Sequence, residues 1–118
     1  LKQIDMNELK FRAWDDKTKT MSAPFTLFSP DIHIYRGWKL MQYTGLKDKN
    51  GMEVYEGDII QTKDWHTDEN GRCVLSEANS YMKKTIVEYT TKHPFIGFTF
   101  HDKCEIIGNI YENPELIK

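Results

Sequence analysis

Two carboxylates stand on either side of a glycine in the run YEGDII, where Glu56 and Asp58 flank Gly57. Carboxylates this close together can act as general acid and general base, or bind a metal ion, when their surroundings move their two pKa values apart. Acidic residues beside glycine are also typical of turns, where water solvates both carboxylates. We predict the turn, with Glu56 and Asp58 solvated, and keep a hydrolase that uses one carboxylate as a weaker alternative.

His101 and Cys104 flank two residues that suit a hairpin turn, so their side chains are expected to lie side by side on paired strands. A histidine and a cysteine can share a zinc ion, but a zinc site needs further ligands, and His66, Cys73 and His93 lie in or beside loops. The same pair could act as nucleophile and base only if a third group oriented the base. We therefore predict no metal site, no cofactor and no catalytic residue, with His101 and Cys104 as the candidates if a metal or hydrolytic site exists.

Lysines gather in the predicted turns, near two tryptophans expected to be exposed. They are Lys47, Lys49, Lys83, Lys84 and Lys92, and the tryptophans are Trp38 and Trp65. Small β-barrels bind nucleic acid through basic and aromatic residues on one open face. Lysines are also common in any solvated turn, where they keep sheet edges from pairing. Nucleic-acid binding through Lys47, Lys49, Lys83, Lys84 and Trp65 is therefore the alternative to protein binding.

The composition limits the other function classes. The chain has 118 residues, which suits a single domain, and its 16 basic and 18 acidic residues give a net charge of −2. This charge provides no general attraction to phosphate backbones. The sequence contains no apolar run of about 18 residues, so we predict no membrane partner. Two cysteines are too few for a secreted disulfide scaffold, which indicates a cytoplasmic protein, although a Cys73–Cys104 disulfide stays open.

Short runs with a period of two, each closed by turn residues, predict a mainly β chain that forms a barrel or a sandwich. Asn50-Gly51 predicts a hairpin between residues 41–43 and 52–54. The polar segment 63–83 is expected to be a mobile loop or insertion, and residues 1–8 a flexible leader. The remaining expected strands are 9–14, an edge strand within 21–28, 32–35, 59–61, 84–89, 96–100 and 104–111. Asn113 and Pro114 predict one helical turn at the end, and Trp14 and Tyr111 are expected to cover the end of the core.

Three ordered blocks resemble the YopX family of bacteriophage and prophage proteins. They are LKFRAWDDKTKTM at 9–21, MQYTGLKDKNGMEVYEGDII at 41–60 and EIIGNIYENPELI at 105–117. The resemblance implies a mostly β protein with an SH3-like barrel, encoded by a phage or prophage. It brings no catalytic residue.

Together the residues and the resemblance predict a non-catalytic accessory protein in the bacterial cytoplasm. We expect it to be a protein adaptor that binds a host or phage macromolecule, with nucleic acid as the alternative ligand. An adaptor should carry an apolar surface patch. Self-association is left open, because short strands with exposed edges can pair between subunits.

Overall fold

The computed structural model describes residues 9–72, 75–90, 97–98 and 104–117, and within them every regular element is a β-strand or a short 3-10 turn. The strands are β1 (Lys10–Asp15), β2 (Thr20–Met21), β3 (Phe25–Thr26), β4 (Lys39–Lys47), β5 (Glu53–Tyr55), β6 (Asp58–Trp65), β7 (Ser80–Ile86), β8 (Tyr89–Thr90), β9 (Gly97–Phe98) and β10 (Glu105–Asn109). The 3-10 turns are η2 (Ile32–Tyr35), η3 (Glu77–Asn79) and η4 (Pro114–Ile117). The predicted mainly β class is confirmed, and so is the helical turn after Asn113.

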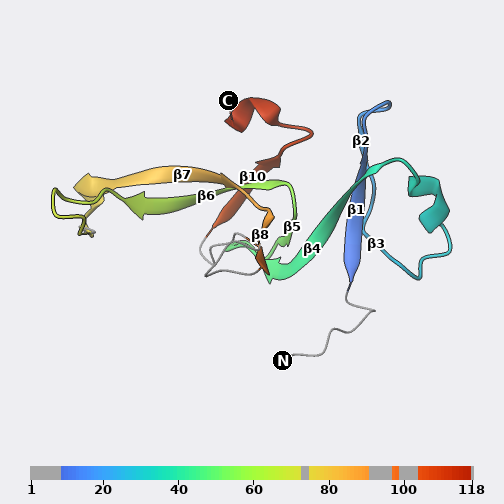
Figure 1. Ribbon diagram of the computed structural model, residues 1–118, viewed down its shortest axis with the longest axis horizontal. Helices are drawn as coiled ribbons and strands as arrows, with labels where there is room; N and C mark the ends of the chain where they lie inside the picture. Colours follow the sequence, from blue (N-terminus) through green and yellow to red (C-terminus); the bar gives the residue numbers. More distant parts are fainter. Residues whose placement is uncertain (1–8, 73–74, 91–96, 99–103, 118) are drawn as a thin grey trace.

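The strands form antiparallel sheets. In the largest, the order is β2-β1-β4-β5, and β3 pairs with the same strand β1. A second sheet has the order β10-β6-β7, and β8 pairs with β9. The first sheet is curled like half of a barrel, while β6 and β7 extend away from it as a long two-stranded ribbon (Figure 1).

The predicted hairpin around Asn50-Gly51 is confirmed. Tyr43 on β4 lies opposite Tyr55 on β5, and Gly51 takes the positive φ of 81° that its turn requires. The Asp48 carboxylate closes the turn by accepting the backbone N–H groups of Asn50 and Met52, both at 2.9 Å. Its other oxygen accepts the N–H of Ile106 at 3.1 Å, which ties the turn to β10.

A tight corner at Gly57 joins the two main sheets. Gly57 has a φ of 91°, and an added Cβ would lie 2.9 Å from the Met41 side chain, so both the backbone and the space favour glycine. The Gly57 N–H donates to the Val87 carbonyl, and the Gly57 carbonyl accepts the N–H of Ile110. The core lies beside this corner and is formed by Val54, Ile60, Val87 and Cys104, with Ile106 packed against it.

Trp14 and Tyr111 pack together as structural residues, as expected. Trp14 is buried, and its ring stacks on that of Tyr111 with 6.0 Å between centroids and 14° between planes. The Trp14 indole N–H donates to Asp16 at 2.9 Å, so its polar edge is satisfied. This contact holds the C-terminal segment against β1.

Two predicted elements differ in the structure. Residues 32–35 form the turn η2 rather than a strand, because local hydrogen bonds from the N–H groups of Ile32 and Ile34 to Ser29 and Asp31 wind the chain. Segment 63–83, expected to be a loop, carries strand at both ends, with Trp65 of β6 paired to Ser80 of β7. This part of the ribbon is largely exposed on both faces. Its sequence therefore lacks the alternation of apolar and polar residues that a strand with one buried face shows. Its mobility stays a prediction.

Candidate functional site

The carboxylate of Asp58 is buried, so the prediction that Glu56 and Asp58 are both solvated is wrong for Asp58. Its side chain is 2% exposed and forms an ion pair with the Arg12 guanidinium. Asp58 also accepts the backbone N–H of Tyr55 at 2.8 Å, which is the turn role that the sequence predicted. Asp58 follows the Gly57 corner as the first residue of β6, where its side chain meets Arg12 of β1. Glu56 is half-buried.

Opposing effects act on the Asp58 carboxyl. Burial raises its pKa above the ordinary value, and this outweighs the attraction of Arg12 and the N–H of Tyr55, which both lower it.

The Arg12 guanidinium also lies over the Tyr55 ring, 4.6 Å from the centroid. Burial, followed by the charge of Glu53, raises the pKa of Tyr55 to about 12. These contacts link β1, β5 and β6, so we interpret the pair of Arg12 and Asp58 as a structural connection. Sequence reasoning missed Arg12, because Arg12 alternates with Phe11 and Ala13 on β1 and so stands where a solvated cation is expected.

The predicted nucleic-acid residues lie on separate elements. Lys47 ends β4 and Lys49 lies in the following turn, 3.4 Å from Glu105. Lys83 and Lys84 are consecutive on β7, so their side chains point to opposite faces of the ribbon. Trp65 ends β6 and is half-buried. The nucleic-acid interface stays a prediction, and Lys92 lies outside the described residues.

Of the candidate metal residues, the structure describes Cys104 and His66. Cys104 is completely buried in the core. His101, Cys73 and His93 lie outside the described residues, and His66 stacks on Tyr81 with 4.5 Å between ring centroids. Across residues 9–72, 75–90, 97–98 and 104–117, no group of three or more His, Cys, Asp or Glu side chains is placed to hold a metal ion. Over the same residues, no helix has the length and hydropathy to span a bilayer.

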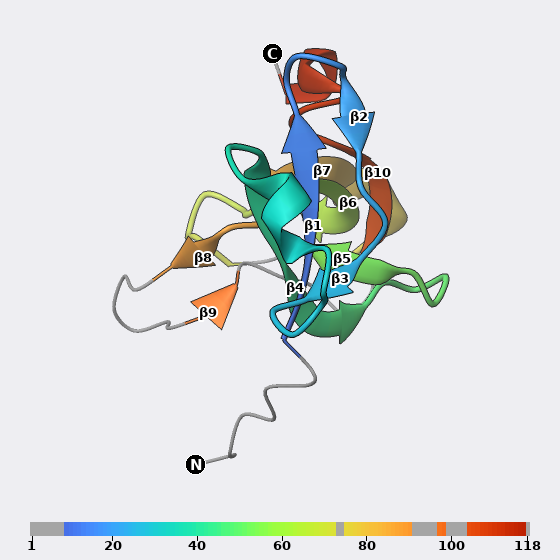
Figure 2. The same cartoon turned by 90° about the vertical axis from the view of Figure 1, so that its right-hand side faces the viewer.

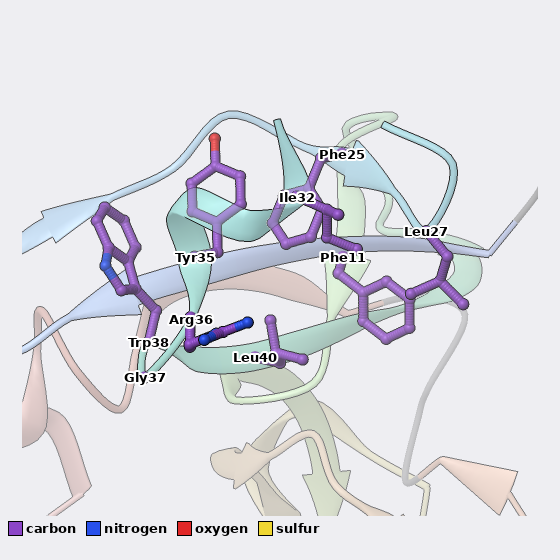
Figure 3. A pocket seen from close by; sticks show the side chains of 9 residues that line it. All are labelled: Phe11, Phe25, Leu27, Ile32, Tyr35, Arg36, Gly37, Trp38 and Leu40. Atoms are coloured by element: carbon purple, nitrogen blue, oxygen red, sulfur yellow. The ribbon is translucent and has the colours of Figure 1, made fainter. Parts of the chain in front are cut away.

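The turn η2 lies against β1, β3 and β4 (Figure 2), and a groove of about 270 Å³ opens where these elements meet (Figure 3). Its lining is aromatic and aliphatic apart from one arginine and one glycine: Phe11, Phe25, Leu27, Ile32, Tyr35, Arg36, Gly37, Trp38 and Leu40. The alternation of β1 places Phe11 on this face and Arg12 on the opposite, buried face. One face of the sheet therefore contributes to the groove, and the other carries the ion pair.

Stacked aromatic rings give the groove its shape. Phe25, held opposite Phe11 by strand pairing, stacks on Tyr35 with 4.3 Å between centroids. Trp38 meets the Tyr35 ring edge-on at 5.2 Å. Gly37, with a φ of 85°, lets the chain turn from η2 into β4, which places Trp38 and Leu40 along the groove. These ring contacts lie within the chain and define the shape of the groove.

Large apolar side chains in this region face solvent. Leu40 is 53% exposed and Leu27 is 41% exposed, and both line the groove. Phe28 and Ile34, in the same segment, are exposed as well. Exposed apolar surface of this kind marks interaction sites. From the sequence, only Trp38 of this region was named as a candidate binding residue. The many apolar residues in FTLFSPDIHIYRGWKL could have indicated a binding surface, but the same composition also suits an edge strand followed by a turn.

Comparison with known proteins identifies the family. The sequence model of the family that is described as "YopX protein" matches residues 25–118, which is well over half of the chain. The chain belongs to the YopX family. The predicted resemblance is confirmed, although its opening block at 9–21 lies before the matched range.

A solved structure has a related fold. It is the crystal structure of protein EF1440 from Enterococcus faecalis, with a TM-score of 0.53 and 26% sequence identity, covering 93% of this YopX-family chain and 98% of that one. The comparison with curated proteins gave no match.

Proposed function

We propose that this YopX-family protein is a non-catalytic accessory protein, encoded by a phage or prophage, that binds a protein partner in the bacterial cytoplasm. The observation that carries the proposal is the aromatic groove between β1, β3, β4 and η2, with Leu27 and Leu40 exposed on its lining. An adaptor requires an apolar surface of this type, and the sequence predicted one without locating it.

Physical reasoning favours a macromolecular ligand for this groove. Its lining offers large, rigid ring surfaces and a single charged side chain, a composition that resembles the central part of protein interfaces. Burying a half-exposed leucine such as Leu40 contributes about 1 kcal/mol, since complete burial of such a side chain contributes about 1.5–3 kcal/mol. A partner that covers Leu27, Leu40 and the edge of Trp38 therefore gains a binding free energy of this size from each of them.

Affinity capture with matched surface variants tests the proposal. Leu40→Glu places a charge on the groove, and Met82→Glu is the control because Met82 on β7 is equally exposed, at 53%. We expect host proteins that the wild type and Met82→Glu retain but Leu40→Glu loses, and the purified partner should show the same preference. If Leu40→Glu retains the same proteins as the wild type, the groove is not the binding site. A gene that lies outside any phage or prophage would contradict the proposed origin.

A further inference from the structure

Arg36 is the charged residue among the nine side chains that line the groove. It is exposed, and Figure 3 shows its guanidinium pointing toward Leu40. Among the ion pairs of the described residues, none involves Arg36. The Arg36 guanidinium, which belongs to none of those ion pairs, therefore lies beside the exposed apolar side chains of the groove.

The neighbouring cations are already neutralised. Lys39, at the start of β4, pairs with Asp16 at 2.6 Å, and Lys10 on β1 pairs with Glu53. Arg12 is bonded to Asp58 on the opposite face of the sheet. The positive charge available to a ligand in the groove is thus the Arg36 guanidinium, which can donate two parallel hydrogen bonds to one carboxylate.

We propose that the partner segment is an acidic apolar peptide, whose large side chains fill the groove and whose Asp or Glu carboxylate pairs with Arg36. This inference rests on the proposed protein-binding function and specifies the chemistry of the partner at that same site. The aromatic rings that line the groove bind the apolar side chains of the peptide. The positive charge of Arg36 favours an acidic residue of the peptide beside them.

A nucleic acid fits the groove less well. Bases can stack on rings such as Tyr35 and Trp38, but single-stranded nucleic acid also needs a row of cations that follow its phosphates. The groove offers one guanidinium, because Arg36 is the one cation in its lining, and the nearby Lys10 and Lys39 pair with Glu53 and Asp16. The observations therefore favour a peptide with an isolated carboxylate.

Selection from displayed random 12-residue peptides tests this inference even while the partner is unidentified. The full chain serves as bait in four forms: wild type, Arg36→Gln, Leu40→Glu and Arg72→Gln. Arg72 is the matched control, because it is an exposed arginine in the segment that connects β6 to β7 and does not line the groove. We expect the wild type to enrich peptides that combine Leu, Phe or Trp with Asp or Glu. The affinity of such a peptide should fall about tenfold with Arg36→Gln and stay unchanged with Arg72→Gln.

The other outcomes separate this inference from the proposed function. Apolar peptides without acidic enrichment, lost with Leu40→Glu but unaffected by Arg36→Gln, would overturn the acidic partner and leave the protein-binding groove intact. If wild type and Leu40→Glu enrich the same peptides or none, both proposals fall. Binding of a labelled 20-nucleotide dT strand that is lost with Arg36→Gln and Trp38→Ala would replace the peptide with a nucleic acid.

Discussion

Replacing Arg12 with methionine removes the cation that faces the buried Asp58 carboxylate while keeping a long, flexible side chain on β1. The Asp58 side chain is 2% exposed, and Arg12 is 17% exposed. Removing one partner of a buried ion pair typically costs about 3–5 kcal/mol, because the remaining charge is left uncompensated. The free energy of unfolding should therefore fall sharply in Arg12→Met.

Protonation of Asp58 sets an upper limit to that loss. A carboxyl with the ordinary pKa of 3.8 can be protonated at pH 7 for about 4.4 kcal/mol, at 1.36 kcal/mol per pH unit. We therefore expect Arg12→Met to lower the free energy of unfolding by about 3–4 kcal/mol at pH 7. At pH 4.5 protonation costs only about 1 kcal/mol, so the carboxylate's share of the loss should shrink to about that value.

The sign of the pH dependence follows from the raised pKa of Asp58. The folded protein holds this proton more tightly than the unfolded chain, so the contribution of Asp58 to stability is greatest below pH 3.8 and declines as pH rises through the folded pKa. Without Arg12, which lowers the pKa, the folded pKa rises further and the decline extends to higher pH.

Urea denaturation followed by tryptophan fluorescence at pH 7 and pH 4.5 measures both effects. Adding Asp58→Asn to Arg12→Met should recover about 2 kcal/mol at pH 7, since asparagine still accepts the Tyr55 N–H without a charge. Lys63→Met is the control, because Lys63 pairs with Glu77 on the surface and such pairs contribute less than about 1 kcal/mol. The reasoning fails if Arg12→Met costs no more than Lys63→Met and its cost does not change with pH.

Three other sites give separate predictions. Gly108→Ala would place a Cβ 2.6 Å from the Asn113 side chain, so we expect the free energy of unfolding, measured by urea denaturation, to fall by about 1–3 kcal/mol. Adding Asn113→Gly should recover most of this loss, and no recovery would show that the contact is not its cause. Burial raises the pKa of Asp48, but the N–H of Ile106 and those of the turn outweigh it and lower the pKa overall. The stability from Asp48 is thus present above pH 3.8 and lost as pH falls through the lower folded pKa, and Asp48→Asn should flatten this acid limb in denaturation curves at pH 2–5; an unchanged limb would exclude the role. Tyr55 should keep its proton until about pH 12 in an ultraviolet titration, and Tyr55→Phe should remove that late step; ionisation of Tyr55 near pH 10 would contradict its burial.

Local signals in the sequence were sufficient for the class of the fold. In Asn50-Gly51, Gly51 supplies the positive φ of the β4–β5 hairpin, and Asn113-Pro114 marks the start of η4, so both elements follow from residues adjacent in the chain. The β6–β7 ribbon was missed between 63 and 83, because strands exposed on both faces show no alternation of apolar and polar residues.

The candidate site depended on contacts between distant residues. The buried Asp58 carboxylate pairs with Arg12, which lies 46 residues earlier, and no local pattern couples the two. The groove likewise joins Phe11 of β1 to Phe25, Tyr35 and Leu40. These residues come from separate elements of the chain, and η2 brings Tyr35 to the sheet (Figure 2). An apolar segment that covers a core and one that lines a surface groove have similar sequences, so composition could predict a binding patch without placing it.

Site-specific photo-crosslinking in the natural host tests the central claim, that the groove binds a protein. Benzoylphenylalanine at Leu40 samples the groove, and the same group at Met82 samples an equally exposed position on β7. We predict a discrete protein adduct from position 40 that is absent from position 82 and that disappears when Trp38→Ala alters the groove. The absence of any adduct from position 40, or the same adducts from both positions, would contradict the account.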